Sequence, residues 1–153
     1  MIRKIESRDI DVVNVIRQQV HTMHVEGEPK RFKPNFTAIK NHIYEYIDSD
    51  SKVVYVYEDD DIILGYIMAD IIEKPESDYR PSVRYIEISE LGVKSGVRGR
   101  GIGTKLIDTI KSYAVDNGVT KIELNMWEFN EQALAFYDKC GFRTFRRYME
   151  IDV

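Results

Sequence analysis

Apolar residues recur at helical spacing in the first third of the chain. Four of them, at positions 10, 13, 16 and 20, predict an amphipathic helix over Arg8–Val25, with Ser7 as its N-cap. A second stripe, at positions 39, 43 and 47, predicts a helix from about Thr37 to Ile47. Glu26–Pro34 lies between the two and contains glycine and proline, so it is predicted to be a loop.

The hydrophobic period then changes from that of a helix to that of a strand. Lys52–Glu58 and Ile62–Ile72 are rich in β-branched and aromatic residues, and the aspartates of Asp59–Asp61 separate them. This pattern predicts a β-hairpin. A polar loop is expected over Glu73–Pro81, and Val83–Lys94 is again typical of a strand.

The second half of the chain alternates between the two periods. It predicts a helix over Gly101–Asn117, a strand over Lys121–Trp127, a helix over Asn130–Cys140 and a last strand over Phe142–Ile151. Helices first, then a hairpin, then alternating strands and helices indicate an α+β or α/β-type fold with a mixed central sheet. The length of 153 residues suits a single domain spanning 1–153.

The composition is that of an ordinary globular protein, with 43% apolar and 31% charged residues. No apolar run approaches the ~18 residues of a membrane span, and acidic residues follow the N-terminus too soon for a signal peptide. The net charge of −4 argues against nucleic acid as a partner, because nucleic-acid-binding proteins present a basic face. Cys140 is the single cysteine, which favours a reducing, cytoplasmic setting.

Two further groups of residues are interpreted as structural. His21 and His24 lie one helical turn apart, but no cysteine or acidic ligand has a suitable spacing, so no metal site is expected. Arg143, Arg146 and Arg147 alternate with aromatic residues in the last predicted strand. They are interpreted as a solvated edge rather than as a phosphate site.

The most informative segment is the glycine-rich turn that follows Val93. Its sequence, V-K-S-G-V-R-G-R-G-I-G-T-K-L, alternates glycines with other residues just before a helix with a well-formed apolar stripe. Glycines let backbone N–H groups approach a ligand closely, and a helix start offers unpaired N–H groups to an anion. Arg98 and Arg100 flank the turn and add charged donors. The segment therefore has the chemistry of a pyrophosphate cradle.

Two common phosphate-binding motifs fail to fit this turn. A P-loop, G-x-x-x-x-G-K-[ST], would need lysine where Ile102 stands. A Rossmann fingerprint, G-x-G-x-x-G, fits Gly99 and Gly101, but Thr104 occupies the third glycine position. Glu123 lies about where a ribose-binding acid would be, so the fingerprint is a near miss.

The spacing that fits is R-x-x-G-x-G, from Arg98 through Gly101 to Gly103, and it resembles the acetyl-CoA motif of the GNAT superfamily of N-acetyltransferases. A second segment, Asn130–Phe142, looks like the family's late N-x-x-A-x-x-F-Y-x-x-x-G-F motif. The resemblance is specific over roughly the C-terminal half. It implies the GNAT-like acyl-CoA acyltransferase fold, whose mixed sheet is mostly antiparallel and flanked by helices.

The resemblance also implies acetyl-CoA as co-substrate, an amine as acceptor and no metal. The implied cofactor-binding residues are Leu91, Gly92, Val93, Arg98, Gly99, Arg100, Gly101, Ile102, Gly103, Thr104 and Asn130. In the family, a β-bulge near the end of this strand frees backbone N–H groups for the oxyanion, and Leu91–Val93 is the matching place.

The chemistry needs a base, because an alkyl amine with a pKa near ~10.4 is mostly ammonium at neutral pH. Glu87 matches the base position of the family's histone-modifying members and is the first choice. Glu90, which aligns with an acidic position common in small bacterial members, is the alternative, and the two are expected to face opposite sides of the sheet. Tyr137 matches the tyrosine that returns a proton to the CoA thiolate. Transfer is then direct, and Cys140 is expected to be structural.

Less specific roles stay open for both catalytic candidates. Glu87 could instead form an ion pair with Arg84 or Arg3, and Tyr137 could be an ordinary core aromatic. Two other classes of protein also stay open, a non-catalytic acyl-CoA-binding module and a nucleotide-binding protein.

The acceptor is expected to be a primary amine of a small molecule, with a lysine or N-terminal amine of a protein as the alternative. In the resembled family the acceptor is selected by the segments that correspond here to His21–Phe36 and Glu73–Pro81. A homodimer is a possible assembly, since dimers are the commonest oligomers.

Overall fold

The computed structural model describes all residues, 1–153, and is built around one five-stranded sheet. The strands are β1 (Ile2–Lys4), β2 (Lys52–Asp59), β3 (Ile62–Lys74), β4 (Val83–Val93) and β5 (Ile122–Leu124), in that order across the sheet. Neighbouring strands are antiparallel except β4 and β5, which run parallel. The predicted mixed, mostly antiparallel sheet is therefore confirmed.

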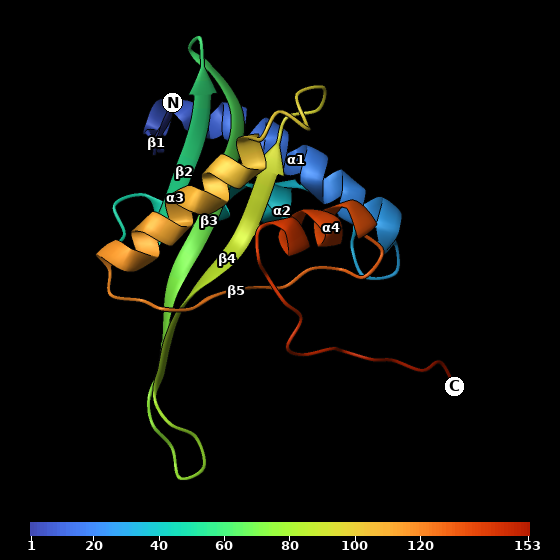
Figure 1. The fold of residues 1–153 in the computed structure, drawn as a ribbon. Coiled ribbons are helices and arrows are strands. Elements are labelled where there is room, and N and C mark those ends of the chain that lie inside the picture. Colours follow the sequence, from blue (N-terminus) through green and yellow to red (C-terminus); the bar gives the residue numbers. More distant parts are fainter.

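Helices cover both faces of this sheet (Figure 1). They are α1 (Ile10–Gly27), α2 (Thr37–Lys40), α3 (Ile102–Asp116) and α4 (Glu131–Lys139), with the 3-10 turns η1 (Ser7–Asp9) and η2 (Asn41–Tyr46). α1 and η2 lie on one face, whereas α3 and α4 lie on the other. The second predicted helix is thus split into α2 and η2. No helix combines the length and the apolar character that crossing a membrane would require.

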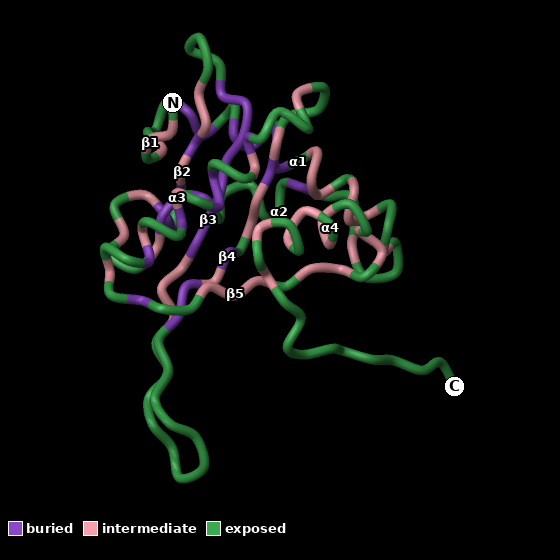
Figure 2. Tube along the Cα trace, viewed as in Figure 1, coloured by how far each residue is buried: buried purple, intermediate pink, exposed green.

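Each face of the sheet has its own apolar core (Figure 2). Along β3, Ile67 and Ala69 are buried against α3, whereas Tyr66 and Met68 are buried against α1. Successive side chains of a strand point to opposite faces, so one strand supplies both cores. This explains why β3 is apolar almost throughout instead of alternating with polar residues.

The N-terminus differs from its prediction, because Ser7 is not the cap of the first helix. The turn η1 comes first, and Glu6 and Asp9 form a capping box around it. Arg3, in the short strand β1, donates hydrogen bonds to Asp9 (2.6 Å) and to Glu58 on β2 (2.8 Å). This ion triad fixes the start of the chain against the edge of the sheet.

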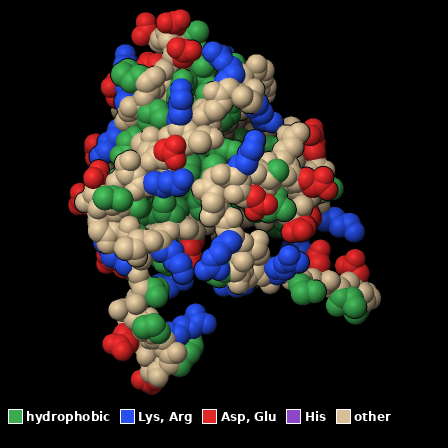
Figure 3. Space-filling view, viewed as in Figure 1, with side chains coloured by type: hydrophobic (Ala, Val, Ile, Leu, Met, Phe, Trp, Pro, Cys, Tyr) green, Lys and Arg blue, Asp and Glu red, His purple; other side chains and the backbone are tan.

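The prediction of a last strand over Phe142–Ile151 was wrong. After α4, the backbone forms neither helix nor strand through Val153, and it extends away from the body. Figure 3 shows this segment and the β3–β4 loop standing off the molecule as two separate arms. The strand predicted over Lys121–Trp127 exists, but it is limited to β5.

Candidate active site

The turn Lys94–Gly101 joins the end of β4 to the start of α3 and forms the cradle. Gly99 and Gly101 have φ values of 81° and 77°, in the left-handed region. A Cβ at either position would meet no atom within 4 Å, so backbone conformation rather than crowding requires glycine there. The backbone N–H groups of Arg98–Thr104 donate no hydrogen bond within the chain. Such a row of free N–H groups at a helix start suits an anion.

Two exposed arginines flank the cradle. The Nε of Arg98 lies 3.5 Å from the carbonyl oxygen of Val93, which is a weak contact at most. Arg100 lies 3.9 Å from a carboxylate oxygen of Asp59, and both of these side chains are at least half exposed. An ion pair of that kind contributes little to stability. Both guanidinium groups are therefore available to a phosphate group.

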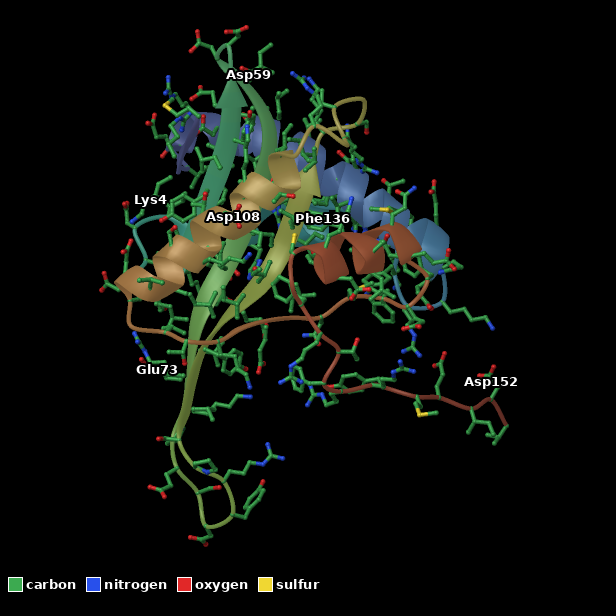
Figure 4. All side chains as sticks on the ribbon, in the orientation of Figure 1. Lys4, Asp59, Glu73, Asp108, Phe136 and Asp152 are labelled. Carbon is green, nitrogen blue, oxygen red and sulfur yellow. The ribbon has the colours of Figure 1, made fainter.

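Gly103 has a packing role in addition to its place in the motif. A Cβ on Gly103 would lie 3.0 Å from Cζ of Phe136, a side chain that lies between α3 and α4 (Figure 4). The preceding residue, Ile102, is buried in the core and anchors the start of α3. The missing side chain at position 103 therefore lets α4 approach the cradle closely.

An open strand edge continues from the cradle along β4. Pairing between β4 and β5 ends at Ile88 and Leu124, whereas β4 stays paired with β3 as far as Val93. The amide of Lys94 donates to β3, and successive amides of an antiparallel strand point to opposite edges. The amides of Val93 and Leu91 therefore point to the open edge. Beyond Ile88 and Leu124, β4 and β5 therefore splay apart.

A β-bulge interrupts β4, although not where the resemblance placed it. Met68 of β3 pairs with Glu90, and the next residue of β3, Ala69, pairs with Ile88. Ser89 is therefore the extra residue. The prediction of a bulge at Leu91–Val93 was wrong in its position by two residues or more.

The bulge shifts the alternation of side chains along β4. Glu87 and Glu90 consequently face the same side of the sheet, that of α1, and the prediction that they face opposite sides was wrong. Gly92, beyond the bulge, pairs regularly with Tyr66. A Cβ on Gly92 would lie 2.4 Å from a ring carbon of Tyr66, so close packing explains this glycine.

Glu90 is held in a polar network on the α1 face. Arg17, whose side chain is 1% exposed, donates from Nε and from an Nη to the two carboxylate oxygens of Glu90, each at 2.8 Å. The hydroxyl of Tyr66 also donates to Glu90, at 3.0 Å. Arg17 further donates to Asn14 and to the carbonyl oxygen of Lys40. Both carboxylate oxygens of Glu90 are therefore occupied by hydrogen-bond donors.

Glu87, in contrast, is half-buried and has no partner for its carboxylate. The two arginines considered as partners are engaged elsewhere. Arg84 donates to Glu73 at 2.7 Å, and Arg3 belongs to the N-terminal ion triad. The alternative of a structural ion pair for Glu87 was therefore wrong.

Glu87 lies in a row of carboxylates that crosses three strands, which we call the acidic rung. It is flanked by Asp70 on β3 and by Glu123 on β5. Lys52 lies 3.6 Å from Asp70, but Glu123 has no such partner. Such a row of carboxylates with a single lysine neighbour is suited to an ammonium group.

The late motif forms α4 on the opposite face. The side chain of Asn130 accepts a hydrogen bond from the amide of Ala133 at 3.1 Å, so Asn130 is the N-cap of α4. Tyr137 packs against the rings of Phe136 and Phe142, and burial raises the pKa of Tyr137 to about 12. Its hydroxyl therefore carries its proton at neutral pH.

The thiol of Cys140, at the end of α4, is partly buried. Burial raises the pKa of Cys140, so the thiolate is scarce at neutral pH. This environment gives the cysteine no activation as a nucleophile.

The structure adds an aromatic bridge that the sequence did not reveal, formed by His24, Phe32, Trp127 and Phe129. The ring of Phe32 stacks on His24 and meets Trp127 edge-on, with centroid separations of 5.4 Å in both pairs. Phe129 meets His24 edge-on at 6.3 Å. The bridge joins α1 and its following loop to the turn between β5 and α4. Burial lowers the pKa of His24, which is therefore neutral at physiological pH.

Arg17 is the residue of this polar network that sequence reasoning missed, although a signal was present. It directly follows Ile16 and precedes Val20 by three residues, so it lies within the apolar stripe of the first helix. A charged residue on the buried face of a helix needs a charged partner. Its partner Glu90 is 73 residues away, and only the fold could identify it.

Comparisons with known proteins agree with this geometry. A family model described as the Acetyltransferase (GNAT) family matches residues 17–142, so the chain belongs to that family. An uncharacterised N-acetyltransferase of Mycobacterium tuberculosis is 29% identical over 107 residues, which are 67% of this chain. The match covers 63% of the relative, less than two thirds of its length.

Solved structures share the fold over the full chain. A Bacillus halodurans protein, solved as a tetramutant, has a TM-score of 0.95 at 28% identity, covering 100% of this chain and 99% of the other. An aminoglycoside N-acetyltransferase in complex with CoA has a TM-score of 0.79 at 16% identity, with 100% and 93% covered. The predicted GNAT fold is therefore confirmed, and acetyl-CoA-dependent N-acetyltransferases are the class to which family and relatives point.

Proposed function

We propose that the chain transfers an acetyl group from acetyl-CoA to a primary amine of a small molecule, by direct attack in a ternary complex. The observation that carries this function is a pair of neighbouring sets of free backbone N–H groups. One set is Arg98–Thr104, in the cradle and the first turn of α3, and the other is Leu91 and Val93 on the open edge of β4. A pyrophosphate and an amide-containing arm need donors in that order.

The proposed cofactor contacts follow this path. The pyrophosphate lies on the N–H groups of the cradle, with Arg98 and Arg100 turning toward it. The pantetheine arm lies along the splay beside Leu91, Gly92 and Val93. Asn130, which caps α4 at the far side of the splay, is a further contact of the cofactor. The cytoplasm, where acetyl-CoA is available, also suits a chain with one inactive thiol.

Glu87 is the proposed base. It removes a proton from the acceptor ammonium, directly or through a water molecule, and the free amine then attacks the thioester carbon. Its freedom from ion pairs favours it over Glu90, which Arg17 and Tyr66 hold. The acidic rung around Glu87 attracts the cationic acceptor before its proton is lost.

The remaining steps use a backbone donor and Tyr137. An outward amide of β4 donates to the oxyanion of the tetrahedral intermediate. When the carbon–sulfur bond breaks, the CoA thiolate takes the electron pair, and the Tyr137 hydroxyl supplies its proton. No acyl-enzyme forms, in keeping with the raised pKa of Cys140.

The aromatic bridge favours a small molecule over a protein as the acceptor. An extended peptide needs an open groove, whereas contacts between Phe32, His24 and Trp127 close the space between the α1 side and the β5–α4 turn. A small amine can reach the acidic rung without opening the bridge.

The first test is thermal unfolding of the full chain with acetyl-CoA, CoA, ATP or NAD. A ligand at about 100 times its dissociation constant adds about 2.7 kcal/mol. For a chain of this size the midpoint should rise by roughly 5–10 °C with acetyl-CoA and CoA. A rise with ATP or NAD alone would instead indicate a nucleotide-binding protein. Thiol release with a panel of amines and peptides then separates an enzyme from a binding module.

The second test compares Glu87→Gln, Glu90→Gln and Tyr137→Phe in steady-state kinetics over a range of pH. Removing a general base should lower kcat about 100-fold or more and remove the acid limb of the pH profile, which is expected for Glu87→Gln. Tyr137→Phe should lower kcat while the affinity for acetyl-CoA stays unchanged. Full turnover in Glu87→Gln, with turnover lost in Glu90→Gln, would assign the base to Glu90.

A further inference from the structure

The C-terminal segment Arg143–Val153, which we call the tail, lacks the contacts that normally hold an extended chain. None of its backbone groups forms a hydrogen bond. Its body contacts are few: Phe145 lies near Lys121, and Glu150 pairs with Arg31. Figure 2 shows the whole tail as exposed.

The tail nevertheless carries large apolar side chains. Val153 at the end of the chain is the most exposed of them, followed by Met149 (92%), Ile151 (87%) and Tyr148 (82%), and Phe145 is 60% exposed. A soluble monomer rarely exposes a contiguous set of this kind, and such sets mark sites of association. The tail is also the segment whose sequence predicts a strand, so its composition is that of a chain that pairs in a sheet.

The body of the protein has an unpaired strand edge that matches the tail. β5 is the last strand of the sheet, and it pairs with β4 alone. An unpaired edge strand presents free N–H and C=O groups and is a template for another strand. No backbone hydrogen bond joins β5 to the tail of its own chain.

The charges of the tail and of the edge are complementary. Glu123 on β5 has no cationic partner, and it adjoins Glu87 in the acidic rung. The tail carries Arg143, Arg146 and Arg147. Opposite charges on paired strands stabilise a sheet, so an arginine-rich strand beside β5 supplies the cation that the rung lacks.

The solved Bacillus halodurans protein provides an independent observation. Its structure superposes on 100% of this chain with a TM-score of 0.95. A score this high requires the tails of the two proteins to follow similar paths. A tail without contacts would instead sample many conformations. Retention of its direction in a protein only 28% identical indicates that something outside the chain holds it.

From these observations we infer that two copies of the chain exchange tails. Arg143–Val153 of each copy pairs with the free edge of β5 in the other and becomes the sixth strand of that sheet. The exchange buries the apolar side chains of the tail and is closed by two-fold symmetry, so it stops at a dimer. The partner's tail then borders the acidic rung, next to the proposed acceptor site.

The test is the sedimentation of the full chain and of two proline variants, Tyr148→Pro and Met149→Pro. Successive amides of a strand point to opposite edges, and proline is tolerated only where the amide faces solvent. Wild type should sediment as a dimer. One of the two variants should weaken dimerisation at least about tenfold, because each dimer loses two hydrogen bonds, while its neighbour should have a much smaller effect.

Folding of the variants is checked by far-ultraviolet circular dichroism, whose helical signal should stay unchanged because no tail residue belongs to a helix or to either buried core. Hydrogen exchange gives a second measurement, since alternate tail amides should be protected in the dimer. A wild type that is monomeric, a dimer that neither proline weakens, or a dimer with unprotected tail amides would each overturn the exchange.

Discussion

The two faces of the sheet are organised by different kinds of interaction. The α3 face has an entirely apolar core, and the cofactor site proposed beside it is a backbone feature within Lys94–Gly101. The α1 face contains buried charge, with Arg17 and Glu90 joined across 73 residues of sequence. A site made from backbone is encoded locally, whereas a site made from side chains of several elements exists only in the folded chain.

The largest effect is expected from breaking the buried ion pair on the α1 face. Arg17→Met leaves Glu90 without its partner and should lower the free energy of unfolding by about 3–5 kcal/mol. Urea unfolding measures the change. Arg8→Met is the matched control, because Arg8 forms an exposed pair with Glu6 and should change stability by less than about 0.5 kcal/mol. Equal losses in the two variants would contradict the assigned role of Arg17.

A smaller effect is expected from Tyr66→Phe, which removes one hydrogen bond to Glu90. A hydrogen bond to a charged group contributes about 1.5–3 kcal/mol, so the loss should fall in that range at neutral pH. Burial raises the pKa of Tyr66 well above its usual value. The stability linked to this raised pKa is fully present below a pH of about 10 and is lost as the pH rises toward the folded-state pKa.

Above a pH of about 10, the free energy of unfolding of Tyr66→Phe should therefore fall less with rising pH than that of wild type. At neutral pH the variant is the less stable of the two. Urea titrations at a series of pH values record both changes. If the free energy of unfolding of the variant falls with pH as steeply as that of wild type in the alkaline range, Tyr66 does not dominate this pH dependence. The other buried tyrosines would then cause it.

The smallest change in stability is expected in the cradle. Gly101→Ala forces a Cβ into a left-handed backbone position and should cost about 1–2 kcal/mol. Gly118→Ala is the matched control, because Gly118 has a similar φ of 65° but lies at the far end of α3. Both variants should lose similar stability, while acetyl-CoA affinity should fall at least about tenfold in Gly101→Ala alone. Affinity for acetyl-CoA is measured by calorimetry. If Gly101→Ala and Gly118→Ala bind it equally well, the turn does not take part in cofactor binding.

The difference between the faces also explains what could be predicted from sequence. The cradle, the hairpin and α4 were predicted because each depends on residues close in the sequence. The bulge at Ser89 could not be predicted, since it is defined by the register against β3. The pairing of Arg17 with Glu90 is likewise a product of the fold. The tail was predicted as a strand from its composition, but a strand needs an edge to pair with, and composition does not say which edge.

The contact between Gly103 and Phe136 has a consequence for how the sequence can change over time. The space above Gly103 is filled by the ring of Phe136, and the next residue of α4 is Tyr137, the proposed proton donor. A side chain gained at position 103 would push the donor away from the cradle unless position 136 became smaller in the same lineage. Positions 103 and 136 are therefore expected to covary among descendants of this chain, as a compensating pair of one small and one large residue.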